Sequence, residues 1–324
     1  AAQEYRRFLA SKPRDTYRAE ALYGLANTHH FLQEYNEARK AFEEFLKVAP
    51  ADHPSIPTAQ FRVGELAYVL GDLPAALQAL EAYTKGSPNH RYQDLAWPYL
   101  GDVQFRQGNL DGARSAYEFA LITFPEGRLS DRARLYLGRV LARQGERSLA
   151  LERFRELIDR PEAAQRDEAL YQVGRLELEA GAFDRAIEAF SMLNREIPQS
   201  PFVPRSQLGI AEALTSLERY GEAAELLNTF RNDHSPELAA RAAYILGLGE
   251  MKRGHLLEAI AVFDEALERF ATSSTAPALL FRSAEAAERQ GDQVDALSRF
   301  ERLAETYPND SWTDDALLQA AALA

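Results

Sequence analysis

The sequence contains no cysteine in its 324 residues. Disulfide bonds, zinc–thiolate sites and cysteine nucleophiles are therefore excluded. No apolar run comes near the roughly 18 residues that a membrane-crossing helix needs. Neither end shows the basic-then-apolar pattern of a signal peptide. The residues given are thus expected to form a soluble chain with no direct membrane span.

Signs of catalysis are also missing. The glycines do not follow the spacing of a phosphate-binding loop. Adjacent helix positions point about 100° apart, so the neighbours His29 and His30 cannot both hold one metal ion. The six histidines are His29, His30, His53, His90, His234 and His255. The sequence therefore predicts no enzyme, no metal site and no cofactor.

Positive charge is scarce near the C-terminal end. The formal net charge is -12. Residues 209–324 hold 20 acidic and 10 basic side chains, against 29 and 27 in residues 1–208. A nucleic-acid binder would display a basic stripe, so this balance argues against a nucleic-acid partner.

What the sequence does contain is a repeat. An alanine recurs every 36 to 38 residues, at Ala1, Ala38, Ala76, Ala113, Ala150, Ala186, Ala223, Ala259 and Ala296. A period in this range is typical of a two-helix unit, and stacked units form a solenoid. A solenoid grows by addition, so we predict one continuous domain over residues 1–324.

Each repeat predicts a helical hairpin. Between Asp167 and Pro198, apolar residues at helical spacing run up to Gly181, resume after it and end at the proline. The turn residue is Gly71, Gly108, Gly145, Gly181, Gly254 or Gly291, with Gln33 and Glu218 in the other two full repeats. Glycine there indicates positive φ.

A second glycine recurs inside the first helix, at Gly64, Gly101, Gly138, Gly174 and Gly247. Glycine in a helix interior costs about 0.8–1 kcal/mol relative to alanine. Five of them at one repeat position require a packing reason. We expect close contact between helix backbones, with the recurring alanines facing the same contact.

The pattern resembles the tetratricopeptide repeat. The fullest match is Trp97, Leu100, Gly101, Gly108, Ala113, Tyr117 and Pro125. The resemblance implies an all-α, right-handed superhelical solenoid of antiparallel helix pairs, with eight full repeats and half a repeat at each end. The predicted repeats are 1–14 (partial), 15–52, 53–89, 90–126, 127–163, 164–199, 200–236, 237–272, 273–309 and 310–324 (partial).

The surplus over the usual 34-residue period lies between the closing proline and the next repeat, as in residues 51–57. Segments 41–50 and 306–311 resemble the longer repeats of bacterial cell-envelope members, of the outer-membrane-assembly lipoprotein and Tol-Pal coordinator type. This likeness implies a periplasmic or cell-envelope location, with a cytoplasmic one as the alternative.

The resemblance also implies that the first helices line a concave groove. Mapped onto the repeats, five arginines are expected to share its middle: Arg106, Arg132, Arg139, Arg143 and Arg175. Guanidinium groups bind oxyanions in bidentate fashion, so this cluster suits an acidic peptide, a C-terminal carboxylate or an anionic glycan. The alternative is internal pairing with Asp102, Glu168 and Glu179.

A row of mostly apolar residues is expected to open toward the same groove: Tyr23, Phe61, Pro98, Leu135, Tyr171, Leu208, Tyr244 and Phe281. Of these, Tyr171 and Tyr244 join the arginines as candidate partner-binding residues. The row could serve as a docking strip or be packed beneath neighbouring side chains.

The sequence thus predicts a scaffold that recruits a protein or peptide, including one with an acidic segment, in a bacterial envelope assembly. The alternatives are a regulatory or targeting segment of a larger enzyme, and an intracellular adaptor or co-chaperone. Because Phe8 and residues 316–324 look like interior faces, we expect a longer protein, or end-to-end packing with another chain.

Overall fold

The computed structural model describes residues 1–230 and 235–324, and all its regular elements in these ranges are helices. Contacts divide the chain into two compact units, Ala1–Arg166 and Asp167–Ala324. Each unit is described by itself. That all repeats form one continuous domain stays a prediction.

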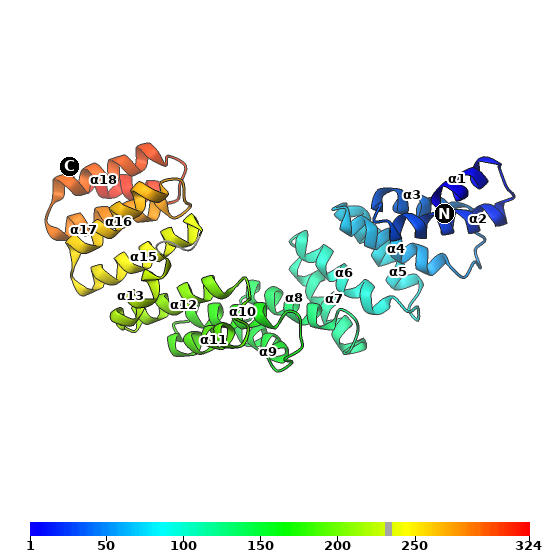
Figure 1. Cartoon of the computed structure of the whole chain (residues 1–324), viewed down its shortest axis with the longest axis horizontal. Coiled ribbons are helices and arrows are strands. Elements are labelled where there is room, and N and C mark those ends of the chain that lie inside the picture. Colours follow the sequence, from blue (N-terminus) through cyan, green and yellow to red (C-terminus); the bar gives the residue numbers. More distant parts are fainter. Residues whose placement is uncertain (231–234) are drawn as a thin grey trace. The chain divides into compact units, whose positions relative to one another are not determined.

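The first unit consists of one single helix followed by four hairpins (Figure 1). Its helices are α1 (Ala2–Ala10), α2 (Asp15–Phe31), α3 (Tyr35–Val48), α4 (Ile56–Val69), α5 (Leu73–Gly86), α6 (Gln93–Arg106), α7 (Leu110–Thr123), α8 (Ser130–Arg143) and α9 (Arg147–Ile158).

The second unit repeats the plan and ends on a single helix (Figure 1). Its helices are α10 (Arg166–Glu179), α11 (Phe183–Glu196), α12 (Val203–Ser216), α13 (Tyr220–Asn228), α15 (Pro236–Arg253), α16 (Leu256–Phe270), α17 (Ala276–Gln290), α18 (Gln293–Thr306) and α19 (Trp312–Leu323). The predicted all-α solenoid of helix pairs, with half a repeat at each end, is confirmed.

The hairpin turns have the predicted backbone. All six turn glycines adopt φ between 71° and 91°. Gln33 and Glu218, which replace glycine, take the same left-handed conformation at φ 60° and 61°. A side chain in this region is strained by roughly 1–2 kcal/mol, so these two turns are held by the packing of the helices on either side.

The recurring alanines are buried, and only the first is an exception. Ala38, Ala76, Ala113, Ala150, Ala186, Ala259 and Ala296 are fully buried, and Ala223 nearly so. Ala1, which precedes α1, is exposed. The small side chain therefore lets the two helices of each hairpin approach along the length of the solenoid.

The interior glycines have a different purpose from the one predicted. A methyl group at Gly138 would lie 2.6 Å from the ring of Phe154, and one at Gly174 would lie 2.5 Å from the ring of Phe190. Leu80, Tyr117 and Phe263 fill the corresponding space in other repeats. The expected contact between backbones is thus wrong. Each glycine leaves a slot for the large side chain that stands four residues after the repeat alanine.

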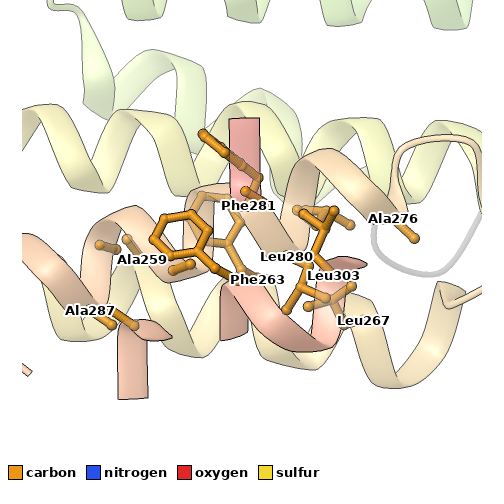
Figure 2. Close-up of a cluster of buried hydrophobic side chains, with 14 of the residues drawn as sticks. Ala259, Phe263, Leu267, Ala276, Leu280, Phe281, Ala287 and Leu303 are labelled. Atoms are coloured by element: carbon orange, nitrogen blue, oxygen red, sulfur yellow. The ribbon is translucent and has the colours of Figure 1, made fainter. Parts of the chain in front are cut away.

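Figure 2 shows the ring of Phe263 and the buried apolar side chains around it, near the C-terminal end. The ring of Phe263 from α16 is fully buried, among a cluster that includes Leu280 and Phe281 of α17 and Leu303 of α18. In each of these hairpins a large side chain of the second helix fills the slot on the first helix, and the core consists of several buried clusters within each unit.

The surplus loop residues are anchored to the preceding repeat. Asp94, at the start of α6, accepts three hydrogen bonds from Arg128 in the loop before α8, and the shortest is 2.6 Å. Asp167 accepts one from Ser200 at 2.7 Å. Glu237 accepts bonds from the Ser273 hydroxyl at 2.7 Å and from the Ser274 backbone at 3.1 Å. A carboxylate on one first helix thus fixes the loop that leads into the next.

Candidate functional site

Four of the five predicted arginines lie in the first unit. Arg106 ends α6, while Arg132, Arg139 and Arg143 lie on one helix, α8. Arg175 belongs to the second unit, on α10. The candidate surface is therefore built from the first unit alone. We call it the arginine–aromatic face: Tyr68 of α4, Tyr99, Phe105 and Arg106 of α6, and Arg132, Tyr136, Arg139 and Arg143 of α8.

Arg132 is largely a structural residue. Its Nη2 lies 2.6 Å from Oδ2 of Asp102 and donates to the hydroxyl of Tyr68 at 2.9 Å. Asp102 is 1% exposed and also accepts a hydrogen bond from the Tyr117 hydroxyl at 2.6 Å. Burial raises the pKa of Asp102, although Arg132 opposes the shift. For Arg132 the alternative of internal pairing is thus the correct one.

Aromatic rings connect the three helices. The rings of Tyr68 and Tyr99 lie 5.2 Å apart, and Phe105 meets Tyr136 edge-on at 5.7 Å. Aromatic pairs at these separations attract one another. Burial raises the pKa of both Tyr68 and Tyr99, so both stay neutral donors at physiological pH.

Arginines lie over these rings. The guanidinium carbon of Arg106 is 5.4 Å from the centre of the Tyr68 ring, and that of Arg143 is 4.5 Å from the Phe105 ring. Arg139 lies 4.9 Å from the Tyr136 ring. Cation–π contacts of this kind hold a guanidinium in one place while its edge stays available for hydrogen bonds.

Two of these arginines remain open to a ligand. Arg106 and Arg143 are both exposed. Within residues 1–230 and 235–324, neither has an acidic partner or a hydrogen-bond acceptor for its side chain. The face therefore presents two positioned cations to solvent, next to aromatic surface.

The predicted site residues of the second unit are engaged in local contacts. Arg175 pairs with Glu179 on its own helix at 3.3 Å, as expected for internal pairing. Tyr171 stacks on Phe202 at 5.2 Å. Tyr244 is half-buried beneath Arg241, whose guanidinium carbon lies 5.4 Å from the ring.

The row of apolar groove residues is packed rather than displayed. The buried members are Phe61, Pro98, Leu135, Leu208 and Phe281, and the half-buried members are Tyr23, Tyr171 and Tyr244. The interpretation of this row as packing beneath neighbouring side chains is thus the one that the structure favours.

Sequence reasoning missed the aromatic half of the face. Tyr68 and Phe105 stand at one repeat position, three residues before the turn glycines Gly71 and Gly108. This shared register was a usable signal. The side chains that each arginine would meet could not be read from the register, because they depend on rotamers.

Histidines of the described residues make other contacts. His29 bonds to Glu34 in a buried position, His53 reaches Glu20 at 3.2 Å, and His234 lies outside the described residues. In the described ranges no three His, Asp or Glu side chains gather in a metal-binding arrangement. No helix in those same ranges is long and apolar enough to cross a membrane.

Comparisons with known proteins find two family models that match parts of the chain. Residues 23–91 and 99–150 match the tetratricopeptide repeat model. Residues 163–323 match the model of the YfiO outer membrane lipoprotein family. The chain thus carries tetratricopeptide repeats in its first part, followed by a region similar to an outer membrane lipoprotein family. A search of curated proteins finds no match.

Solved structures of low sequence identity share the fold. A tetratricopeptide repeat protein from Parabacteroides merdae is 20% identical, with a TM-score of 0.60, over 82% of this chain and 98% of the other. The C-terminal part of a repeat protein from Cytophaga hutchinsonii is 15% identical, with a TM-score of 0.61, over 79% and 99%. PilF of Pseudomonas aeruginosa is 18% identical, with a TM-score of 0.50, over 70% and 97%.

Proposed function

We propose that this protein is a binding scaffold that recruits a protein partner through the arginine–aromatic face, within an assembly of the bacterial cell envelope. Tetratricopeptide repeats are protein-interaction modules, and the family matches support that general role. The observation that carries the finer proposal is the pair Arg106 and Arg143, exposed and backed by aromatic rings.

The charge distribution supports the choice of this face. Residues 1–166 carry 23 basic and 22 acidic side chains, whereas residues 167–324 carry 14 and 27. On α8, Arg132 pairs with Asp102 and Arg134 is buried and pairs with Asp131. The exposed cations of the face are therefore Arg106 and Arg143. A local positive surface on an acidic chain attracts acidic partners and steers their approach.

The envelope location rests on the match of residues 163–323 to an outer membrane lipoprotein family. A non-catalytic role follows from the same reasoning, since the repeats supply surface rather than a reaction centre. A periplasmic site of action is the corresponding proposal for localisation.

Photo-crosslinking tests the proposal. A benzophenone amino acid would replace Gln107, the exposed neighbour of Arg106, in the chain exported to the periplasm of a Gram-negative host. The matched control carries the same group at Ser115, an exposed position on α7. We expect a discrete protein adduct in the envelope fraction from position 107 and none from position 115. Equal adducts from both positions, or none from either, would refute the proposed face.

End-to-end packing is a second, separate proposal. Phe8 of α1 is 44% exposed, and Leu317 and Leu318 of α19 are 51% and 68% exposed. Apolar side chains at the first and last helices suit contact with further helices. Sedimentation of the purified chain at rising concentration tests this, and Leu317→Ser/Leu318→Ser should lower any self-association.

A further inference from the structure

Four residues of the first unit occupy one repeat position along its hairpin turns. Each stands two residues before the positive-φ residue of its turn. We call Phe31, Val69, Arg106 and Arg143 the turn-edge row. They end or nearly end the successive first helices α2, α4, α6 and α8.

All four side chains of the row are exposed, two of them apolar and two cationic. Phe31 is 86% exposed and Val69 is 50% exposed, and Leu32, next to Phe31, is 53% exposed. Arg106 and Arg143 are exposed as well. Two apolar positions are therefore followed by two cationic ones, and their exposure leaves all four without a core-packing role.

The arginines of the row make the same contact in successive repeats. Arg106 of α6 lies over Tyr68 of α4, and Arg143 of α8 lies over Phe105 of α6. Each guanidinium therefore lies over an aromatic ring of the preceding first helix. The N–H groups on its edge can then take a carboxylate in bidentate fashion.

The first helices of neighbouring repeats lie side by side, as Nε2 of His30 on α2 shows at 3.7 Å from Oε2 of Glu65 on α4. Packed helices are separated by about 8–10 Å, and an extended peptide advances about 3.3 Å per residue. One step along the row therefore equals about three residues of an extended peptide.

We propose that the turn-edge row binds an extended acidic segment of a partner protein. The segment presents two apolar side chains three residues apart to Phe31 and Val69, and two carboxylates three residues apart to Arg106 and Arg143. Charge complementarity with Arg106 and Arg143 selects the acidic end. This inference rests on the scaffold function proposed above and specifies the partner's chemistry.

Fluorescein-labelled synthetic peptides provide the probe. The test peptide carries two leucines and then two glutamates, each spaced by three residues, and a second peptide carries the same order reversed. One control has the same composition at two-residue spacing, and another replaces glutamate by glutamine. We expect the peptide of one of the two orders to bind, as measured by fluorescence anisotropy, and each control peptide to bind about tenfold more weakly.

Variants of the chain locate the binding. Arg106→Gln/Arg143→Gln should weaken binding of the test peptide by about tenfold or more, and Phe31→Ser/Val69→Ser should weaken it without changing its salt dependence. Arg14→Gln/Arg18→Gln makes the same change of charge at two exposed positions, the N-cap and the first turn of α2, at the opposite end of that helix. This variant should bind as the parent does. Circular dichroism confirms that each variant is folded.

Several results would overturn the inference. Equal binding of the peptides with two-residue and three-residue spacing would show non-specific attraction. The same conclusion would follow if Arg14→Gln/Arg18→Gln weakened peptide binding as much as Arg106→Gln/Arg143→Gln. If the chain self-associates and Arg106→Gln/Arg143→Gln abolishes this, the row binds a second copy of the chain instead of a partner's acidic segment. If anionic lipid vesicles bind as tightly as the test peptide, the row binds a membrane surface instead. If the peptides fail while the adduct at position 107 persists, the row is wrong and the scaffold stands. If both fail, the proposed function fails too.

Discussion

The glycine slots allow a test within a single helix. Gly247 and Gly249 both lie inside α15, two residues apart. A methyl group at Gly247 would lie 2.2 Å from the buried ring of Phe263, whereas one at Gly249 would lie 3.7 Å from the nearest atom, in the ring of Tyr220. The first position has no room for a side chain, and the second gives ordinary contact.

The magnitudes follow from two opposing effects. Replacing a mid-helix glycine by alanine stabilises the helix by about 0.8–1 kcal/mol, and overpacking a core costs about 1–3 kcal/mol. Gly249→Ala should therefore raise the free energy of unfolding by nearly 1 kcal/mol. Gly247→Ala should lower it by up to about 2 kcal/mol, because both effects act there.

Urea denaturation followed by circular dichroism measures both variants. Since the helix-propensity gain is common to them, the difference between the two isolates the ring contact, at about 1–3 kcal/mol. Adding Phe263→Leu should recover part of the loss in Gly247→Ala, because Leu80 fills the equivalent slot beside Gly64. If Gly247→Ala proves as stable as Gly249→Ala, the explanation of the interior glycines is incorrect.

Three further substitutions test other parts of the fold. Glu218→Gly should raise the free energy of unfolding by about 1 kcal/mol in urea titration, because it relieves a side chain at φ 61°. Glu237→Gln should lower the free energy of unfolding by about 1 kcal/mol at neutral pH, because it removes charge-assisted hydrogen bonds whose strength solvent screening reduces. The Ser274 hydroxyl lowers the pKa of Glu237 in the folded state. The stabilisation by Glu237 is therefore present above the pKa of this group in the unfolded chain, and it is lost as the pH falls through its pKa in the folded state. Urea titrations repeated at acid pH should show the same free energy of unfolding for Glu237→Gln and the parent. Ala186→Leu should cost about 1–3 kcal/mol at a fully buried position, whereas thermal melts of Ala1→Leu, at an exposed position, should match the parent.

The repeat made the backbone of this protein predictable. Spacing alone located the hairpins and the positive-φ turns, because a two-helix unit repeated eight times averages out local ambiguity. The reason for the glycines at positions such as Gly138 was not predictable in the same way. The sequence shows that a small residue is needed there, but the choice between a backbone and a ring as the neighbour depends on three-dimensional packing.

The candidate site was predictable in part. The register placed Arg106, Arg132 and Arg143 on first helices, where the structure has them. It could not separate Arg132, which neutralises the buried Asp102, from Arg106 and Arg143, which face solvent. That distinction depends on which side chains are within reach, and contacts between residues about 30 apart, such as this pair, follow only from the fold.

The carboxylates that fix the interhairpin loops define where the protein could be divided. Because Asp94 holds Arg128, and Asp167 holds Ser200, a hairpin removed at its closing proline would lose the loop that its own acid secures. The smallest transferable module is therefore a helix pair together with the loop that follows it. Chimeras joined after Arg128 or Ser200 should preserve the native spacing between repeats. Chimeras joined at Pro125 or Pro198 would leave Asp94 or Asp167 without its loop partner.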